Sequence, residues 1–257
     1  MYSPQEKEVY DKLIRVVGSE MDIRIRQNMF LIKDKIFNEG NTQLTQISSG
    51  SLAEGLDLPG SDVDIMYAIN GVKVIQDVQH MNRSSRCTTL LMEEEMKFPG
   101  FSRLKLIAYG DHHYICTSPE CFVQTTNGMF LSNISFISKL LGGVPDIKNS
   151  VHGPCLSDKY ETQDLAVCFH LYSWPRQAEH FLYRHRPGQW PSDILIDDIV
   201  NYGCILVPIG PKEIKNSELL WRISFSVAET IITCYELHTN PVLRSSETVS
   251  KEHYRQK

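Results

Sequence analysis

Apolar residues recur about every four positions through residues 6–37, and this stripe constrains the fold more than any other feature of the chain. Its members are Val9, Leu13, Val17, Met21, Ile25, Met29, Ile32 and Ile36. This spacing places them on one face of an α-helix. Ser3 before a proline is typical of a helix start, and Gly40 followed by asparagine of a helix stop. About 30 residues at about 1.5 Å each predict one rod of roughly 45 Å, bent at Gly18, that contacts more than one layer of the core.

Short segments with turn residues between them follow this helix. Alternation or continuous apolar runs predict strands at residues 44–47, 63–69, 101–109, 161–171, 206–210 and 221–226, and helical spacing predicts helices at 130–141, 176–183 and 193–202. Asn70-Gly71 is a strong signal for a two-residue hairpin. We therefore expect an α+β fold with a long N-terminal helix and a central twisted mixed sheet. Residues 1–236 form the expected domain, and residues 237–257 are a polar tail.

The composition is that of a soluble globular protein. The 257 residues are 42% hydrophobic and 22% charged, which excludes collagenous, coiled-coil and mostly disordered classes. A net charge of −5 argues against a surface built throughout to neutralise phosphates. Seven cysteines without a repeated spacing indicate free thiols in a reducing compartment. With no apolar run of about 18 residues and no secretory leader, we expect a cytoplasmic protein, with the nucleus as the alternative.

One stretch carries the residues expected to do chemistry. Gly50-Ser51 precedes a turn rich in glycine and proline, and Asp62 and Asp64 then lead into an apolar strand. Residues two apart in a strand point to the same face, so the two carboxylates would lie together and repel each other unless a cation sits between them. A hard divalent ion such as Mg²⁺ is the natural partner. The backbone of Gly50 and the hydroxyl of Ser51 could hold a phosphate.

The two aspartates have a simpler interpretation, and a second group of residues has the chemistry of a zinc site. An Asp-x-Asp pair also occurs in exposed turns and on edge strands, where both carboxylates are merely solvated. His112, His113, Cys116 and Cys121 are zinc-type ligands, but their order and gaps match no standard zinc finger or ribbon. We therefore expect no zinc.

These residues also resemble a known family. Gly50-Ser51 followed by Ser61-Asp62-Val63-Asp64-Ile65-Met66 is similar to the signature of the nucleotidyltransferase fold in the Mab (male-abnormal) family, which includes cyclic GMP-AMP synthase and the animal cGAS-like receptors. The resemblance covers roughly residues 5–236. Later segments agree in order with landmarks of the invertebrate members: residues 151–155, 163–169, 172–175, 190–191, 206–209 and 220–229.

The resemblance implies a fold, a site and a reaction. The fold would be a nucleotidyltransferase fold whose N-terminal helix is a spine, and Asp164 would be the third carboxylate of the metal site. Asp62, Asp64 and Asp164 would be the catalytic residues and hold two Mg²⁺ or Mn²⁺ ions about 4 Å apart. Gly50 and Ser51 would bind the nucleotide triphosphate. Without the resemblance, the position of Asp164 at the start of an apolar run favours a solvated residue at a strand end over a metal ligand.

The substrates implied are ATP and GTP, joined into a dinucleotide that is cyclic in the receptors, and the implied activator is double-stranded RNA or DNA in innate immunity. Family members continue after residue 233 with a helical lobe that closes the nucleotide cleft, whereas this chain departs from them there. Three hypotheses therefore stand: a metal-dependent nucleotidyltransferase, a non-catalytic Mab-type module that binds a nucleotide or a protein, and a truncated inactive product.

Overall fold

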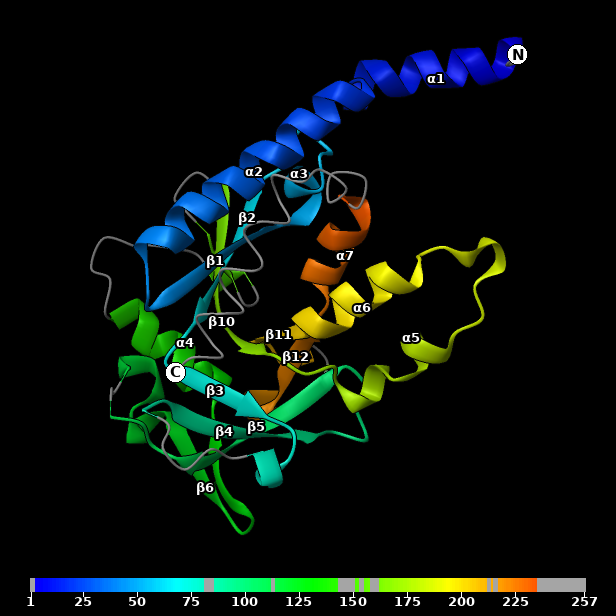
Figure 1. Ribbon diagram of the computed structural model, residues 1–257. Coiled ribbons are helices and arrows are strands. Elements are labelled where there is room, and N and C mark those ends of the chain that lie inside the picture. The colour runs from blue at the N-terminus through cyan, green and yellow to red at the C-terminus, as the bar shows by residue number, and fades with distance from the viewer. Residues whose placement is uncertain are drawn as a thin grey trace.

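Two N-terminal helices lead into a twisted mixed sheet, which further helices cover (Figure 1). This computed structural model describes residues 3–80, 86–111, 114–142, 151–152, 155–157, 162–211, 214 and 217–234. The fold is α+β, with a long N-terminal helical arm and a mixed sheet, as expected from the sequence. The predicted tail, residues 237–257, lies outside the described residues. None of the described helices is long and apolar enough to cross a membrane.

The N-terminal rod is two helices, α1 (Pro4–Val17) and α2 (Glu20–Gly40), so the prediction of one continuous helix is wrong. Gly18 between them has a φ of 97°, a conformation that ends α1. Ser19 then begins α2 with a capping box, in which its hydroxyl accepts from the backbone of Asp22. Ser3 caps α1 in the same way, and α2 ends at Gly40, as predicted.

The apolar stripe of these helices is exposed, so the rod does not contact the core through it as the sequence predicted. No described residue of α1 is buried, and Gln27 is the buried residue among those of α2. The body instead receives polar groups of α2. Asp34 accepts hydrogen bonds from the backbone N–H and the hydroxyl of Ser48, and Asn38 accepts from the N–H of Gln46 and donates to its carbonyl.

The reason lies in the strand that α2 covers. β1 (Leu44–Ser49) is at one end of the strand order and pairs with β2 (Val63–Ile69) on one side. Its other side presents backbone N–H and C=O groups that need partners. Polar side chains on the inner face of α2 supply those partners. The inner face also carries apolar side chains, of which the ring of Phe37 lies 5.4 Å from the ring of Tyr67 on β2.

Strands of the described chain form one sheet in the order β1-β2-β10-β11-β12-β5-β4-β3, to which the pairs β6-β7 and β8-β9 are attached. The strands after β1 are β2 (Val63–Ile69), β3 (Val72–Ile75), β4 (Thr88–Glu94), β5 (Phe101–Ala108), β6 (Phe122–Thr125), β7 (Gly128–Leu131), β8 (Val151–His152), β9 (Cys155–Ser157), β10 (Gln163–Leu171), β11 (Cys204–Val207) and β12 (Trp221–Ser224). β2 runs parallel to β10, and β3 runs parallel to β4.

The hairpin predicted at Asn70-Gly71 does not form. The two residues turn the chain between β2 and β3, but β3 pairs with β4 rather than with β2. β2 already has β1 on one side and β10 on the other, so it has no free edge for β3. A local turn signal does not report this competition, because the competing strand lies far along the sequence.

The core is centred on three aromatic side chains from three elements. Trp221 of β12, Phe169 of β10 and Phe136 of α4 are fully buried, with ring centroids 5.1 to 5.3 Å apart. The indole N–H of Trp221 donates to the carbonyl of Leu131. The remaining helices are α3 (Gly50–Ala53), α4 (Asn133–Gly142), α5 (His180–Tyr183), α6 (Asp193–Tyr202) and α7 (Ser226–Thr233).

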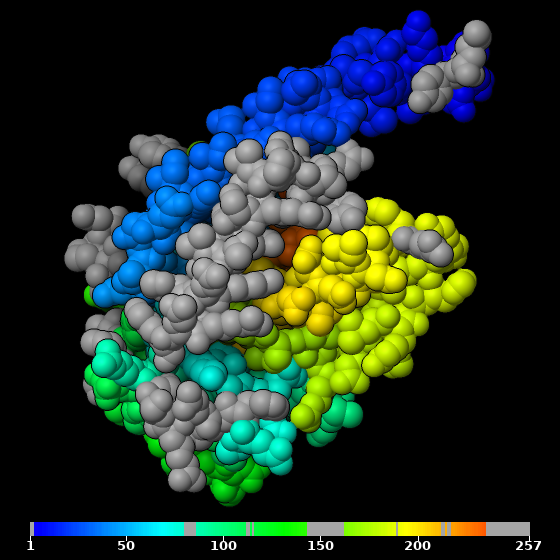
Figure 2. Space-filling model, viewed as in Figure 1, coloured from blue at the N-terminus to red at the C-terminus, as the bar shows by residue number. Residues whose placement is uncertain are grey.

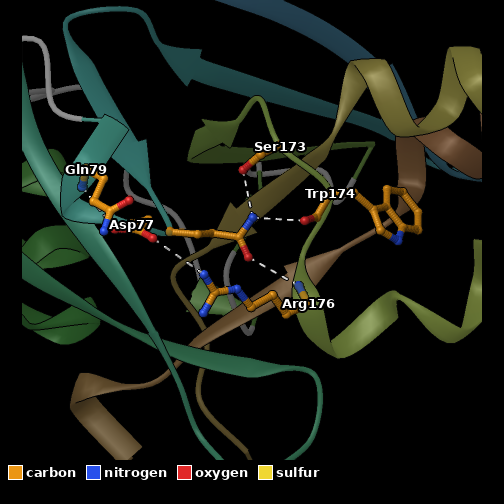
Figure 3. Close-up of polar contacts among 6 residues, drawn as sticks. Asp77, Gln79, Ser173, Trp174 and Arg176 are labelled. Carbon is orange, nitrogen blue, oxygen red and sulfur yellow. Dashed lines mark hydrogen bonds and ion pairs between the residues drawn. The ribbon is translucent and has the colours of Figure 1, made fainter.

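A polar junction ties the segment after β3 to the segment after β10 (Figure 3). The side-chain amide of Gln76 donates to the hydroxyl of Ser173 at 2.7 Å and to the carbonyl of Trp174 at 2.9 Å. The same amide accepts from the backbone N–H of Arg176, whose guanidinium approaches the carboxylate of Asp77. These contacts join two parts of the chain that are about a hundred residues apart.

Candidate metal centre

The parallel pairing of β2 and β10 brings three aspartates together. Asp164 lies directly beside Asp64 in the register of the two strands, and Asp62 precedes β2 by one residue. Each of the three offers a carboxylate oxygen, and these oxygens all lie within 4.8 Å of one another. All three side chains are half-buried. The sheet therefore gathers in one place the carboxylates that the sequence analysis assigned to a metal site.

The turn at Gly50 packs directly against this cluster. β1 ends at Ser49, which is paired with Asp64, and the chain then turns into α3. Gly50 has a φ of 74°, and a Cβ at this position would collide with the Oδ2 atom of Asp64. Ser51 follows in α3 and is half-buried. The predicted nucleotide-binding residues Gly50 and Ser51 are thus next to the predicted metal ligands.

The cluster is electrostatically unfavourable without a counterion. The pKa of Asp64 is raised to about 6, first by burial and then by the charges of Asp62 and Asp164. Burial penalises the charged carboxylate, and each neighbouring negative charge adds to that penalty. A bound cation would relieve both effects. Three carboxylates with oxygen donors suit a hard divalent cation.

Glu54 lies close to this turn, and no sequence pattern singled it out. Its backbone N–H donates to the carbonyl of Gly50, and its own carbonyl accepts from the side chain of Gln27 on α2. The pKa of its carboxyl is raised, mainly by burial and also by Glu229 on α7. Its spacing of three residues from Ser51 is the one signal that could have drawn attention to it. Glu54 thus joins the turn to α2, and the same side chain of Gln27 also donates to the carbonyl of Thr233 on α7.

The residues considered for zinc are not brought into a described cluster. Cys116 and Cys121 are buried in short helical turns, and burial raises the pKa of the Cys116 thiol to about 12. His112 and His113 lie outside the described residues.

Comparison with known proteins gives no assignment. No protein-family model matches the chain, and no curated protein matches it.

Proposed function

We propose that this chain is a metal-dependent nucleotidyltransferase of the cGAS-like receptor type, with a Mab-type nucleotidyltransferase fold. The single observation that carries the proposal is the convergence of Asp62, Asp64 and Asp164 beside the turn at Gly50. Asp62 and Asp64 are two residues apart in the sequence, but Asp164 lies in a strand 100 residues after Asp64. Assembly of such a set by strand register, half-buried and against a glycine turn, is characteristic of a binding site rather than of a solvated surface.

Each residue has a role in this proposal. Asp62, Asp64 and Asp164 hold Mg²⁺ or Mn²⁺, and the backbone at Gly50 with the hydroxyl of Ser51 holds the triphosphate of the donor nucleotide. When bound, such a cation neutralises phosphate charge and makes a ribose hydroxyl more acidic. The fixed carboxylates position the substrates, so that the hydroxyl of one nucleotide faces the α-phosphate of the other, and pyrophosphate leaves as the phosphodiester forms.

The resemblance supports ATP and GTP as substrates, a cyclic dinucleotide as the product, and double-stranded RNA or DNA as the activator. The place of action that we propose is the cytoplasm, with the nucleus as the alternative. The half-buried carboxylate set supports a divalent cation without distinguishing Mg²⁺ from Mn²⁺. The same set would also serve a module that binds a metal–nucleotide complex without turning it over, so the experiment must separate binding from catalysis.

The decisive experiment incubates the purified chain with ATP, GTP and Mg²⁺ or Mn²⁺, with and without double-stranded RNA or DNA, and separates the products by chromatography. We expect a new phosphodiester product that is lost in Asp164→Asn and kept in Asp197→Asn, a matched change of an exposed aspartate on α6. Calorimetric titration of nucleotide with the metal runs in parallel. Binding without product would identify a non-catalytic module, and absence of both would refute the proposal.

A further inference from the structure

The turn that follows β1, residues 50–56, carries the groups proposed to bind phosphate and is held together by its own backbone. Three N–H groups donate within it: Glu54 to the carbonyl of Gly50, Gly55 to that of Leu52, and Leu56 to that of Ser51. These bonds are 2.8 to 3.1 Å long. Because they link both ends of a short segment, a contact that fixes one end of the turn also restricts the other end.

Both ends of this turn pack closely against other elements. At one end, a Cβ on Gly50 would collide with the carboxylate of Asp64. At the other end, Gly55 has a φ of 93°, and a Cβ there would lie 2.5 Å from the Cγ2 of Ile23 and 3.2 Å from the Cγ of Gln27, both on α2. The turn therefore lies between the carboxylate cluster and α2, and glycine at each end permits the close approach.

Gln27 makes the buried polar contact between α2 and this turn. Its side chain is 4% exposed, and its amide nitrogen donates to the carbonyl of Glu54 at 2.9 Å and to the carbonyl of Thr233 at 3.4 Å. A buried amide is tolerated when its hydrogen bonds are made, and these two bonds fix where the side chain lies. Gln27 thus connects three elements: α2, the turn and the end of α7.

Arg26 makes a second contact with the turn, but it leads to a different part of the molecule. Its guanidinium donates to the carbonyl of Gly55 and, at 2.6 Å, to the carbonyl of Val17 at the end of α1. Because α1 stands away from the body (Figures 1 and 2), Arg26 joins the turn to the N-terminal arm. Gln27, in contrast, joins the turn to the body of the protein through α7.

We propose that Gln27 is a positioning residue of the nucleotide site, whose amide holds the turn so that the backbone at Gly50 and the hydroxyl of Ser51 can receive the triphosphate. This inference rests on the proposed function, because it takes the turn to bind phosphate. The three aspartates are placed by the register of β2 and β10. Gln27 should therefore govern the affinity for nucleotide and not the affinity for the cation alone.

The test measures two affinities of the full chain by calorimetry: that for Mn²⁺ alone, and that for ATP with Mn²⁺ saturating. Gln27→Met keeps the length of the side chain and removes its N–H donors, so the carbonyls of Glu54 and Thr233 lose their partner. We expect ATP to bind about tenfold more weakly, whereas Mn²⁺ affinity stays within about twofold of the wild type. Gly55→Ala, which forces the turn away from α2, should give the same split.

Two variants are matched controls. Asn38→Leu also removes hydrogen bonds from the inner face of α2, but those bonds are made to the backbone of Gln46 on β1 and not to the turn. Gly60→Ala places a side chain at a φ of 85°, close to that of Gly55, where a Cβ would meet no atom within 4 Å. Both controls should leave the two affinities unchanged, and circular dichroism checks that every variant is folded.

The outcomes separate this inference from the proposed function. If Gln27→Met binds ATP as tightly as the wild type does, or loses Mn²⁺ and ATP affinity in parallel, Gln27 is not a positioning residue and the proposed function stands. A wild-type chain that binds Mn²⁺ but no ATP would refute the proposed function and this inference with it. If Gln27→Met does not fold, Gly55→Ala compared with Gly60→Ala decides the question by the same two affinities.

Discussion

The backbone of Gly50 lies against the carboxylate of Asp64, so a side chain at position 50 would collide with that carboxylate. Gly50→Ala should weaken divalent-cation binding at least about tenfold, because Asp64 must move, and should cost roughly 1–3 kcal/mol of stability for the clash in addition to the cost of a positive φ. Calorimetry with Mn²⁺ and urea unfolding measure the two effects.

Gly60 provides the control for this substitution. Its φ is 85°, close to the 74° of Gly50, but a Cβ there would meet no atom within 4 Å. Gly60→Ala should therefore show the backbone cost of about 1–2 kcal/mol and leave cation binding unchanged. If the two variants lose cation affinity equally, the contact between Gly50 and Asp64 is not what positions the site.

The raised pKa of Asp64 also predicts how the free energy of unfolding changes with pH. Because its pKa in the folded protein is raised to about 6, the fold holds this proton more tightly than the unfolded chain does. Its stabilising contribution is thus fully present below about pH 4 and is lost as the pH rises through about 6. In the absence of divalent cations, Asp64→Asn should remove this loss and increase stability near pH 8 by on the order of 1–2 kcal/mol.

Urea unfolding at about pH 4.5 and about pH 8 checks the sign, since the gain from Asp64→Asn should be small at the lower pH. Added Mg²⁺ should stabilise the wild-type chain and not the variant, because it binds the charged carboxylates of the folded state. Asp197→Asn on the exposed face of α6 should change neither profile. A variant that is less stable than the wild type at both pH values would show that the Asp64 carboxylate is not under repulsion.

Two of the three carboxylates could be predicted from spacing, and the third could not. Asp62 and Asp64 are two residues apart in an extended segment, so their shared direction follows from strand geometry alone. Asp164 joins them through the parallel register of β2 and β10, which no local pattern encodes; its assignment came from the resemblance. The contact of Gly50 with Asp64 was also beyond prediction, since it depends on how α3 follows β1.

At the scale of elements, α2 protects the outer edge of β1 with side chains rather than with another strand. Asp34 accepts three hydrogen bonds, from the N–H and the hydroxyl of Ser48 and from the amide of Gln46. Asp34→Ala would leave these donors without their acceptor and should cost roughly 2–3 kcal/mol in urea unfolding. Lys35→Ala is the control, because Lys35 is the next residue of α2 and is exposed; it should cost less than about 0.5 kcal/mol.

This arrangement explains why the helical stripe misled the prediction about the core. Apolar periodicity identifies a helix, but the inference that its apolar face points inward assumes that the body offers an apolar surface. Here the body offers the polar edge of β1 to Asp34 and Asn38, and the carbonyls of Glu54 and Thr233 to Gln27, so these three side chains are turned inward. The helical structure and its end at Gly40 could be predicted from the sequence. The division into α1 and α2 could not, because it depends on the φ that Gly18 adopts. β2 and α6 have the bounds that were predicted, and β1, β5, β10 and β12 differ from the prediction by at most two residues at one end. The strand predicted at residues 206–210 is β11, which begins two residues earlier and ends three residues earlier. The mixed character of the sheet was also predicted.

At the scale of the whole molecule, the carboxylate site and the hydrophobic core share a strand. β10 carries Asp164 near its start and Phe169 five residues later, where the ring packs against Phe136 and Trp221. The core holds β10 in register with β2, and this register sets the distance between Asp64 and Asp164. Once the sheet is formed, the position of Asp164 follows from its hydrogen-bonded neighbours rather than from distant packing.

Removing one member of the aromatic trio should therefore separate stability from cation binding. Phe136→Ala deletes a fully buried ring of α4 and should cost about 3–5 kcal/mol, lowering the melting temperature by on the order of 10 °C. Well below that temperature, Mn²⁺ affinity should stay within about twofold of wild type, because β2 and β10 retain their pairing. Tyr183→Ala, which removes an 82% exposed ring, should change neither quantity. A fall in affinity for folded Phe136→Ala would mean that α4 packing, and not strand register, positions Asp164.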